Sequence, residues 1–181
     1  MGTIKTTNIE PIADNGTVTL GSSGDTFTLG SGVVQSNLNY PAFEAEISGT
    51  ITLTASTTET IPFSVENLDT NSAFDTGTYT FQPTVAGKYF VYAQARFSHG
   101  GDDLGYIQIS LINESDSNIV TAIQEDRDQN NAESRMLNFS KIVDMNGSTN
   151  TLRVTSFAEQ LGAGSITLRS NTLFGAYRIG S

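Results

Sequence analysis

One hairpin signal stands out in the sequence: Phe74-Asp-Thr-Gly-Thr-Tyr-Thr-Phe-Gln-Pro-Thr-Val-Ala-Gly-Lys-Tyr-Phe-Val-Tyr92. Aromatic residues alternate with threonines before a connection that contains Pro83 and Gly87, and aromatic residues with valine follow it. Aromatic and β-branched residues fit a pleated surface, whereas proline and glycine favour turns. The stretch therefore predicts two antiparallel strands joined as a hairpin.

Segments with the same alternation recur along the rest of the chain, and turn residues separate them. The pair Asn146-Gly147 between two apolar segments is the strongest hairpin signal among these turns. Only residues 131–145 have a spacing that a helix would also fit. The expected strands cover residues 43–47, 51–53, 61–65, 78–81, 88–97, 104–112, 119–123, 136–143, 152–157, 165–169 and 172–179. This pattern predicts an all-β fold, an antiparallel jelly-roll sandwich of about ten strands.

The first part of the chain contains a short repeat. Thr17-Val-Thr-Leu-Gly-Ser22 is followed nine residues later by Thr26-Phe-Thr-Leu-Gly-Ser31, and each copy predicts a short strand that ends in a turn. A strand of this kind needs neighbours to bury its apolar side. We therefore predict a β-rich N-terminal stub, residues 1–39, that attaches or intertwines, and a jelly-roll head, residues 40–181.

The segment 74–92 and the closing segment Asn171 to Gly180 resemble the jelly-roll modules of the tumour necrosis factor and complement globular-head superfamily. In that superfamily a G-x-Y/F-x-F-x-P-x-x-x-G-x-Y hairpin lies in the middle of the domain, and the final strand reads F-x-G. The resemblance covers roughly residues 40–181. It implies a homotrimeric binding head rather than an enzyme.

The opening segment resembles the N-terminal segments of structural proteins in tailed bacteriophages. It runs Gly2-Thr-Ile-Lys-Thr-Thr-Asn-Ile9 and continues into Gly16-Thr-Val-Thr-Leu-Gly-Ser-Ser-Gly-Asp-Thr26. This resemblance implies a virion protein, made in the host cytoplasm and attached to other virion proteins through the stub. It would be a capsid-decorating fibre or knob, or a tail-fibre tip. The alternative is a soluble complement-head-like ligand-binding module that is not part of a virion.

The composition excludes several classes of partner. The net charge is -10 with only nine lysines and arginines, so the chain lacks the basic surface that nucleic acid requires. No stretch approaches the roughly 20 apolar residues of a membrane-spanning helix, so we expect no membrane insertion. The absence of cysteine excludes disulfides and thiolate metal sites.

We expect no catalytic residues and no cofactor. The single histidine, His99, is predicted to lie in a solvated turn beside Ser98 rather than in a catalytic triad. Asp102 and Asp103 offer oxygens to a calcium ion, but a plain polar turn is favoured because no ordered loop of carboxylates follows. The carboxylates that a glycosidase would need, among them Glu114, Glu125 and Glu159, are expected to be exposed loop charges.

The segment 88–97 is apolar on both faces, although a sandwich strand usually has one wet face. The second apolar face predicts contact with another subunit, and the alternative is a central strand shielded by loops. On the analogy with the tumour necrosis factor and complement globular-head superfamily, the candidates for the trimer interface are Tyr89, Phe90, Tyr92, Leu173 and Tyr177.

Residues 125–135 form a long, strongly polar run. Binding functions concentrate on such loops when a rigid scaffold presents them, although an ordinary solvated connection has the same composition. The candidates for contact with host surface glycans are Asp126, Arg127, Asp128 and Asn130. The loops 98–103 and 159–164 are weaker candidates on the same argument.

Overall fold

The computed structural model describes residues 41–100, 104–125, 134–160 and 164–180, and the single residues 9, 19, 21, 22, 26 and 31. Internal contacts divide the chain into two units, Met1–Ser36 and Asn37–Ser181, and the described strands belong to the second. Most of the predicted stub, residues 1–39, lies outside the described residues, so its boundary stays a prediction. The described part of the chain contains no helix long and apolar enough to cross a membrane.

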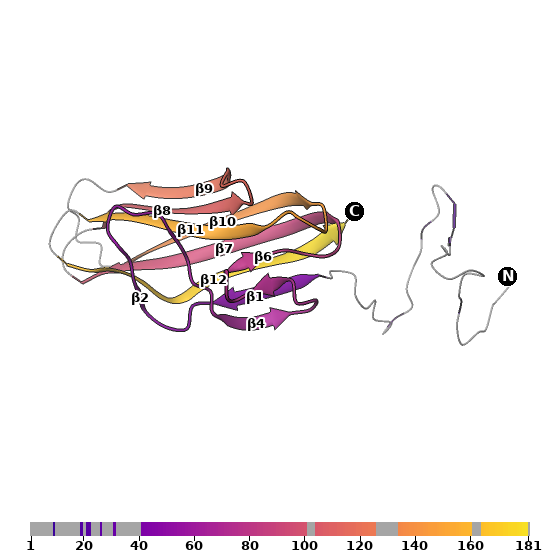
Figure 1. Cartoon of the computed structure of the whole chain (residues 1–181), viewed down its shortest axis with the longest axis horizontal. Coiled ribbons are helices and arrows are strands. Elements are labelled where there is room, and N and C mark those ends of the chain that lie inside the picture. Colours follow the sequence, from indigo (N-terminus) through magenta and orange to yellow (C-terminus); the bar gives the residue numbers. More distant parts are fainter. Residues whose placement is uncertain are drawn as a thin grey trace. The chain divides into compact units, whose positions relative to one another are not determined.

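The prediction of an all-β sandwich is confirmed. Twelve strands in the described ranges form two antiparallel sheets (Figure 1). Sheet A contains, in order, β10 (Ser134–Met145), β7 (Gly87–His99), β12 (Ile166–Gly180), β1 (Ala42–Glu46) and β4 (Val65–Asp69), with β2 (Ile51–Thr52) beside β12. Sheet B contains, in order, β5 (Phe74–Asp75), β6 (Thr80–Phe81), β11 (Leu152–Gln160), β8 (Leu104–Asn113) and β9 (Asn118–Glu125), with β3 (Glu59–Thr60) beside β11.

An aromatic cluster fills the space between the two sheets. Phe43 of β1 stacks on Phe74 of β5 and Phe81 of β6, with ring centroids 4.7 and 4.5 Å apart. Phe174 of β12 meets Phe43 edge to face at 4.9 Å. All four rings are buried, and they connect the centre of sheet A to one end of sheet B.

Both predicted hairpins connect strands of different sheets, so the expectation that their strands pair is wrong. β6 belongs to sheet B and β7 to sheet A, and the turn at Asn146-Gly147 likewise leads from β10 in sheet A to β11 in sheet B. Phe81 and Tyr89 still meet, but as rings 5.5 Å apart across the core. Turn residues determine where the chain reverses direction, whereas the packing of the two sheets determines which strands share hydrogen bonds.

Strand β7 corrects two predictions. It continues through His99, which pairs with Ile166 and is only 4% exposed, so the prediction of a solvated turn histidine is wrong. The alternation that buries Phe97 also points His99 inward. Tyr89 is completely buried, and its hydroxyl donates to the carbonyl oxygen of Val85 at 2.7 Å. Tyr89 is therefore a core residue and is not available at an interface on the outer face.

Other strand boundaries also differ from the prediction. Residues 61–63 are not a strand, although Ile61 and Phe63 are buried and Ile61 donates a backbone hydrogen bond to Val154. The strand in this region, β4, begins only at Val65. β5 was not predicted, and residues 134–145 are a strand rather than the alternative helix.

The two predicted strands at the end of the chain are one strand, β12, interrupted by a bulge. Arg169 pairs with Arg96 and Leu173 with Gln94. Three residues of β12 therefore lie opposite a single residue of β7. Asn171 adopts a positive φ of 71° within the bulge. The buried Thr172 hydroxyl accepts a hydrogen bond from the backbone NH of Arg96 at 3.0 Å and donates to the Arg169 carbonyl at 2.8 Å. The Thr172 side chain thus replaces ladder hydrogen bonds that the bulge removes.

Replacing Thr172 with valine tests this role. The change keeps the shape but leaves the Arg96 NH and the Arg169 carbonyl without this partner, so the free energy of unfolding should fall by about 1–3 kcal/mol. Urea unfolding of the purified protein measures the loss. The matched control is Thr52→Val at an exposed position of β2, which should change stability by less than about 0.5 kcal/mol. Equal stability of the two variants would contradict a bridging role for Thr172.

Candidate functional site

The outer face of sheet A carries apolar side chains where a sandwich sheet is usually polar. We call the group Phe90, Tyr92, Leu173 and Tyr177 the aromatic face. Phe90 and Tyr177 are direct partners on β7 and β12, with ring centroids 5.4 Å apart, and Tyr92 lies 6.2 Å from Phe90. Each of the four side chains is half-buried within the single chain.

Tyr92 is fixed in position by a glycine below its ring and a carboxylate beside it. It pairs with Gly175 on β12, and a Cβ atom at Gly175 would lie only 2.4 Å from the Tyr92 ring. The Tyr92 hydroxyl donates to Oε2 of Glu44 on β1 at 2.7 Å. Burial, followed by the hydrogen bond and the negative charge of Glu44, raises the pKa of Tyr92 well above its usual range. The ring is therefore held flat against the sheet in its neutral form.

Exposed aliphatic residues extend the aromatic face toward both edges of sheet A. Ile142 of β10 is the partner of Phe90 and is 54% exposed, and Leu68 of β4 is the partner of Glu44 and is 51% exposed. Glu44 lies between Leu68 and Gly175, so the apolar surface is interrupted on the β4 side. Apolar side chains grouped on the outer face of a sheet are typical of an interaction site. Four of the five predicted interface residues lie together on this face, and Tyr89 lies in the core. Their contact with another subunit stays a prediction.

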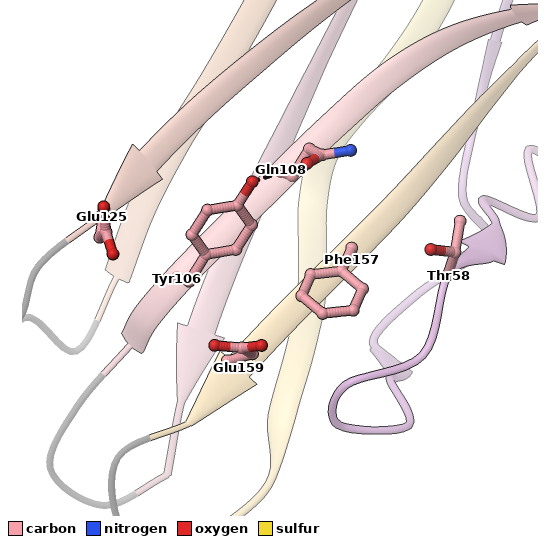
Figure 2. A pocket seen from close by; sticks show the side chains of 6 residues that line it. All are labelled: Thr58, Tyr106, Gln108, Glu125, Phe157 and Glu159. Atoms are coloured by element: carbon pink, nitrogen blue, oxygen red, sulfur yellow. Dashed lines mark hydrogen bonds between the residues drawn. The ribbon is translucent and has the colours of Figure 1, made fainter. Parts of the chain in front are cut away.

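The outer face of sheet B contains an open hollow of about 550 Å³ (Figure 2). Its floor holds two aromatic rings, Tyr106 of β8 and Phe157 of β11, which meet edge to face at 5.7 Å. Glu125 of β9 and Glu159 of β11 are the direct neighbours of Tyr106 across the sheet. The remaining lining residues are Thr58 and Gln108.

A chain of hydrogen bonds fixes the floor of this hollow. The Tyr106 hydroxyl donates to the side-chain oxygen of Gln108 at 2.7 Å, and the Gln108 amide donates to the Ser110 hydroxyl at 2.9 Å. Ser110 in turn is 2.9 Å from the Thr121 hydroxyl on β9. The ring of Tyr106 is thus oriented by side chains of two neighbouring strands.

Sequence reasoning missed Tyr106, Phe157 and Gln108. The sequence signal that could have found them is the alternation of inward and outward side chains along a strand. Tyr106 and Phe157 are next to the buried residues Ile107 and Ala158, so each ring lies on the solvent side of its strand. Only the register of β8 between β9 and β11 brings these rings to Glu125 and Glu159.

The predicted loop and metal residues fall outside the described part of the chain. These are the glycan-contact candidates Asp126, Arg127, Asp128 and Asn130, and the weighed calcium ligands Asp102 and Asp103. Within the described ranges there is no group of three or more His, Cys, Asp or Glu residues that could hold a metal ion.

Two of the carboxylates weighed for a glycosidase, Glu125 and Glu159, do share the hollow. They lie on the two strands that flank Tyr106. Their backbones are therefore two strand spacings apart, roughly 10 Å. Both are exposed and lack the apolar enclosure that a general acid requires.

Comparison with solved structures shows which class of protein has this fold. Eiger TNF from S. frugiperda matches with a TM-score of 0.56 and 13% identity, over 79% of this chain and 94% of that one. Murine APRIL at pH 5.0 matches with a TM-score of 0.57 and 10% identity, over 76% of this chain and 98% of that one. At these identities the likeness establishes the fold alone, a jelly roll like that of the tumour necrosis factor ligands. No protein-family model and no curated protein matches the sequence.

The raised pKa of Tyr92 predicts how the stability of the protein depends on pH. Because its pKa is higher in the folded chain than in the unfolded chain, the unfolded state loses this proton first as pH rises. The stabilisation is complete below about pH 10, the ordinary tyrosine pKa, and is lost progressively above it. Urea unfolding of wild type and Tyr92→Phe between pH 8 and 11 should give curves that converge above about pH 10. Curves that stay parallel would show that Tyr92 does not titrate differently on folding.

Proposed function

We propose that this chain is a non-enzymatic, homotrimeric structural protein of a virion, a jelly-roll head carried by an N-terminal stub. The observation that carries the self-association is the aromatic face of sheet A. Phe90, Tyr92, Leu173 and Tyr177, with Ile142 beside them, leave an apolar surface at the centre of a sheet that the single chain does not cover. A second copy of the chain would remove this surface from water.

The trimeric state and the location on a virion are proposed from resemblance to known families. The motif in residues 74–92 is that of a superfamily whose heads are trimers, and the fold agrees with that superfamily. The opening residues 2–26 resemble phage structural proteins, which supports a position on the capsid or the tail of a virion. The polar loop with Asp126, Arg127, Asp128 and Asn130 is proposed to touch host surface glycans, where many copies per particle would supply avidity.

A second candidate is a soluble ligand-binding module of the complement-head type outside a virion. The hollow on sheet B favours it, because a recessed site with aromatic lining is typical of ligand binding. The two candidates differ in whether the protein is found on particles.

Self-association through the aromatic face is tested with Phe90→Glu. A charge at the centre of an apolar interface costs several kcal/mol unless it is paired, so the trimer should dissociate at micromolar concentration. Sedimentation velocity measures the mass of wild type and variant. The matched control is Ile123→Glu on β9, which is 54% exposed and lies on the outer face of sheet B. A folded wild-type monomer at micromolar concentration would refute the proposal, and dissociation by the control would place the interface elsewhere.

The role of the stub is tested by deleting residues 1–39. The stub contributes too few apolar residues for a core of its own, so the truncated head should stay soluble and all-β while no longer entering particles. Circular dichroism measures the first outcome, and immunogold labelling of purified particles measures the second. Full-length protein with the same tag is the control. Aggregation of the truncated protein alone would show that the stub belongs to the core of the head.

A further inference from the structure

The hollow on sheet B has features that the proposed structural role does not use. Tyr106 and Phe157 occupy solvent-side positions, yet both rings are half-buried against each other in an edge-to-face contact. Both rings line the hollow, and the face of an aromatic ring carries partial negative charge. Cations are attracted to such a face within about 6 Å of its centre.

The polar groups around these rings are mainly hydrogen-bond acceptors. Glu125 and Glu159 flank Tyr106 on the two neighbouring strands, and an ionised carboxylate accepts but does not donate. The Gln108 amide has two hydrogens, one of which donates to Ser110, and the Gln108 oxygen accepts from Tyr106. Among the lining residues, the second amide hydrogen of Gln108 and the Thr58 hydroxyl are therefore the possible donors.

These features select the chemistry of a ligand. A phosphate or carboxylate is repelled by two glutamates on a chain of net charge -10. A neutral sugar requires donors as well as acceptors, and the hollow presents few donors. A positively charged nitrogen on an apolar chain satisfies the ring face, the carboxylates and the apolar floor together. We propose that the hollow binds an organic cation, an alkylammonium or guanidinium group, between Tyr106, Phe157, Glu125 and Glu159.

The exposure of the two carboxylates predicts weak binding of a single cation. Both carboxylates are exposed, so water and salt screen their attraction and a single contact is weak. The hydrogen bonds from Tyr106 through Gln108 to Ser110 hold the ring in place beforehand, which lowers the entropy cost of binding. The site lies on sheet B, so it does not depend on self-association through sheet A.

A titration of the isotope-labelled full-length protein tests the proposal. The probes are tetramethylammonium, N-acetyl-lysine methylamide, N-acetyl-arginine methylamide and, as a neutral ligand, glucose. We expect saturable chemical-shift changes at Tyr106 and Phe157 with the cations, weakened by added salt, and none with glucose. Tighter binding of the two amino-acid amides would support a side chain of a partner polypeptide as the source. Tighter binding of tetramethylammonium would support a small quaternary amine.

Two variants with one matched control locate the site. Glu159→Gln removes one charge at constant shape, and Phe157→Leu removes a ring but keeps an apolar side chain. Each should weaken cation binding by about threefold to tenfold. Glu66→Gln, at an exposed position of β4 in sheet A, changes the net charge equally and should leave binding unchanged.

The measurements can overturn the assignment. If Phe157→Leu does not fold, Glu159→Gln decides alone, because its side chain is exposed and its loss does not open the core. Cation binding that Glu159→Gln leaves unchanged would refute the site. The absence of saturable shifts with all three cations would refute it as well. Glucose binding in preference to the cations would replace the proposal with a sugar site.

Discussion

The packing of aromatic rings around Phe43 holds the two sheets together. The ring centroid of Phe43 lies within 4.9 Å of those of Phe74 and Phe81 in sheet B and of Phe174 in sheet A. The chain has no cysteine, so no disulfide supplements this apolar contact. Phe43 lies on the first strand of the head and Phe174 on the last, and β1 and β12 are neighbours. The core is therefore complete only when the two ends of the head have met, which is characteristic of folds dominated by long-range pairing and of slow folding.

This inward packing leaves the outward positions of each strand free to differ between the sheets. Because side chains alternate along a strand, a residue such as Tyr92 can serve an outer surface without disturbing Val91 in the core. Sheet A uses these positions for apolar side chains, with Tyr92 held by Gly175 and Glu44. Sheet B uses them for a hollow that combines rings with carboxylates. The two outer faces thus differ in chemistry, one mainly apolar and the other combining aromatic rings with carboxylates.

The alternation of inward and outward side chains along β12 is the same on both sides of its bulge. Between the pairs Arg169–Arg96 and Leu173–Gln94, four steps along β12 match two steps along β7. An insertion of two residues preserves the parity of the strand, because the side-chain period is two. Leu168 and Phe174, on either side of the bulge, therefore both face the core. A single inserted residue would have turned one of them toward solvent.

The sequence by itself determined the class of fold and most of the strands, because alternation along each strand and turn residues between strands are local properties. It also proposed Phe90, Tyr92, Leu173 and Tyr177, together with Tyr89, as interface candidates, and the pairing of β7 with β12 puts the first four on one face of sheet A. Only the tertiary structure decided which strands pair. It moved Tyr89 and His99 into the core, assigned the strands of both predicted hairpins to different sheets, and brought Tyr106, Phe157 and the two glutamates together. The physical reason is that register and sheet assignment depend on the joint packing of segments far apart in the chain, about which a single segment carries no information.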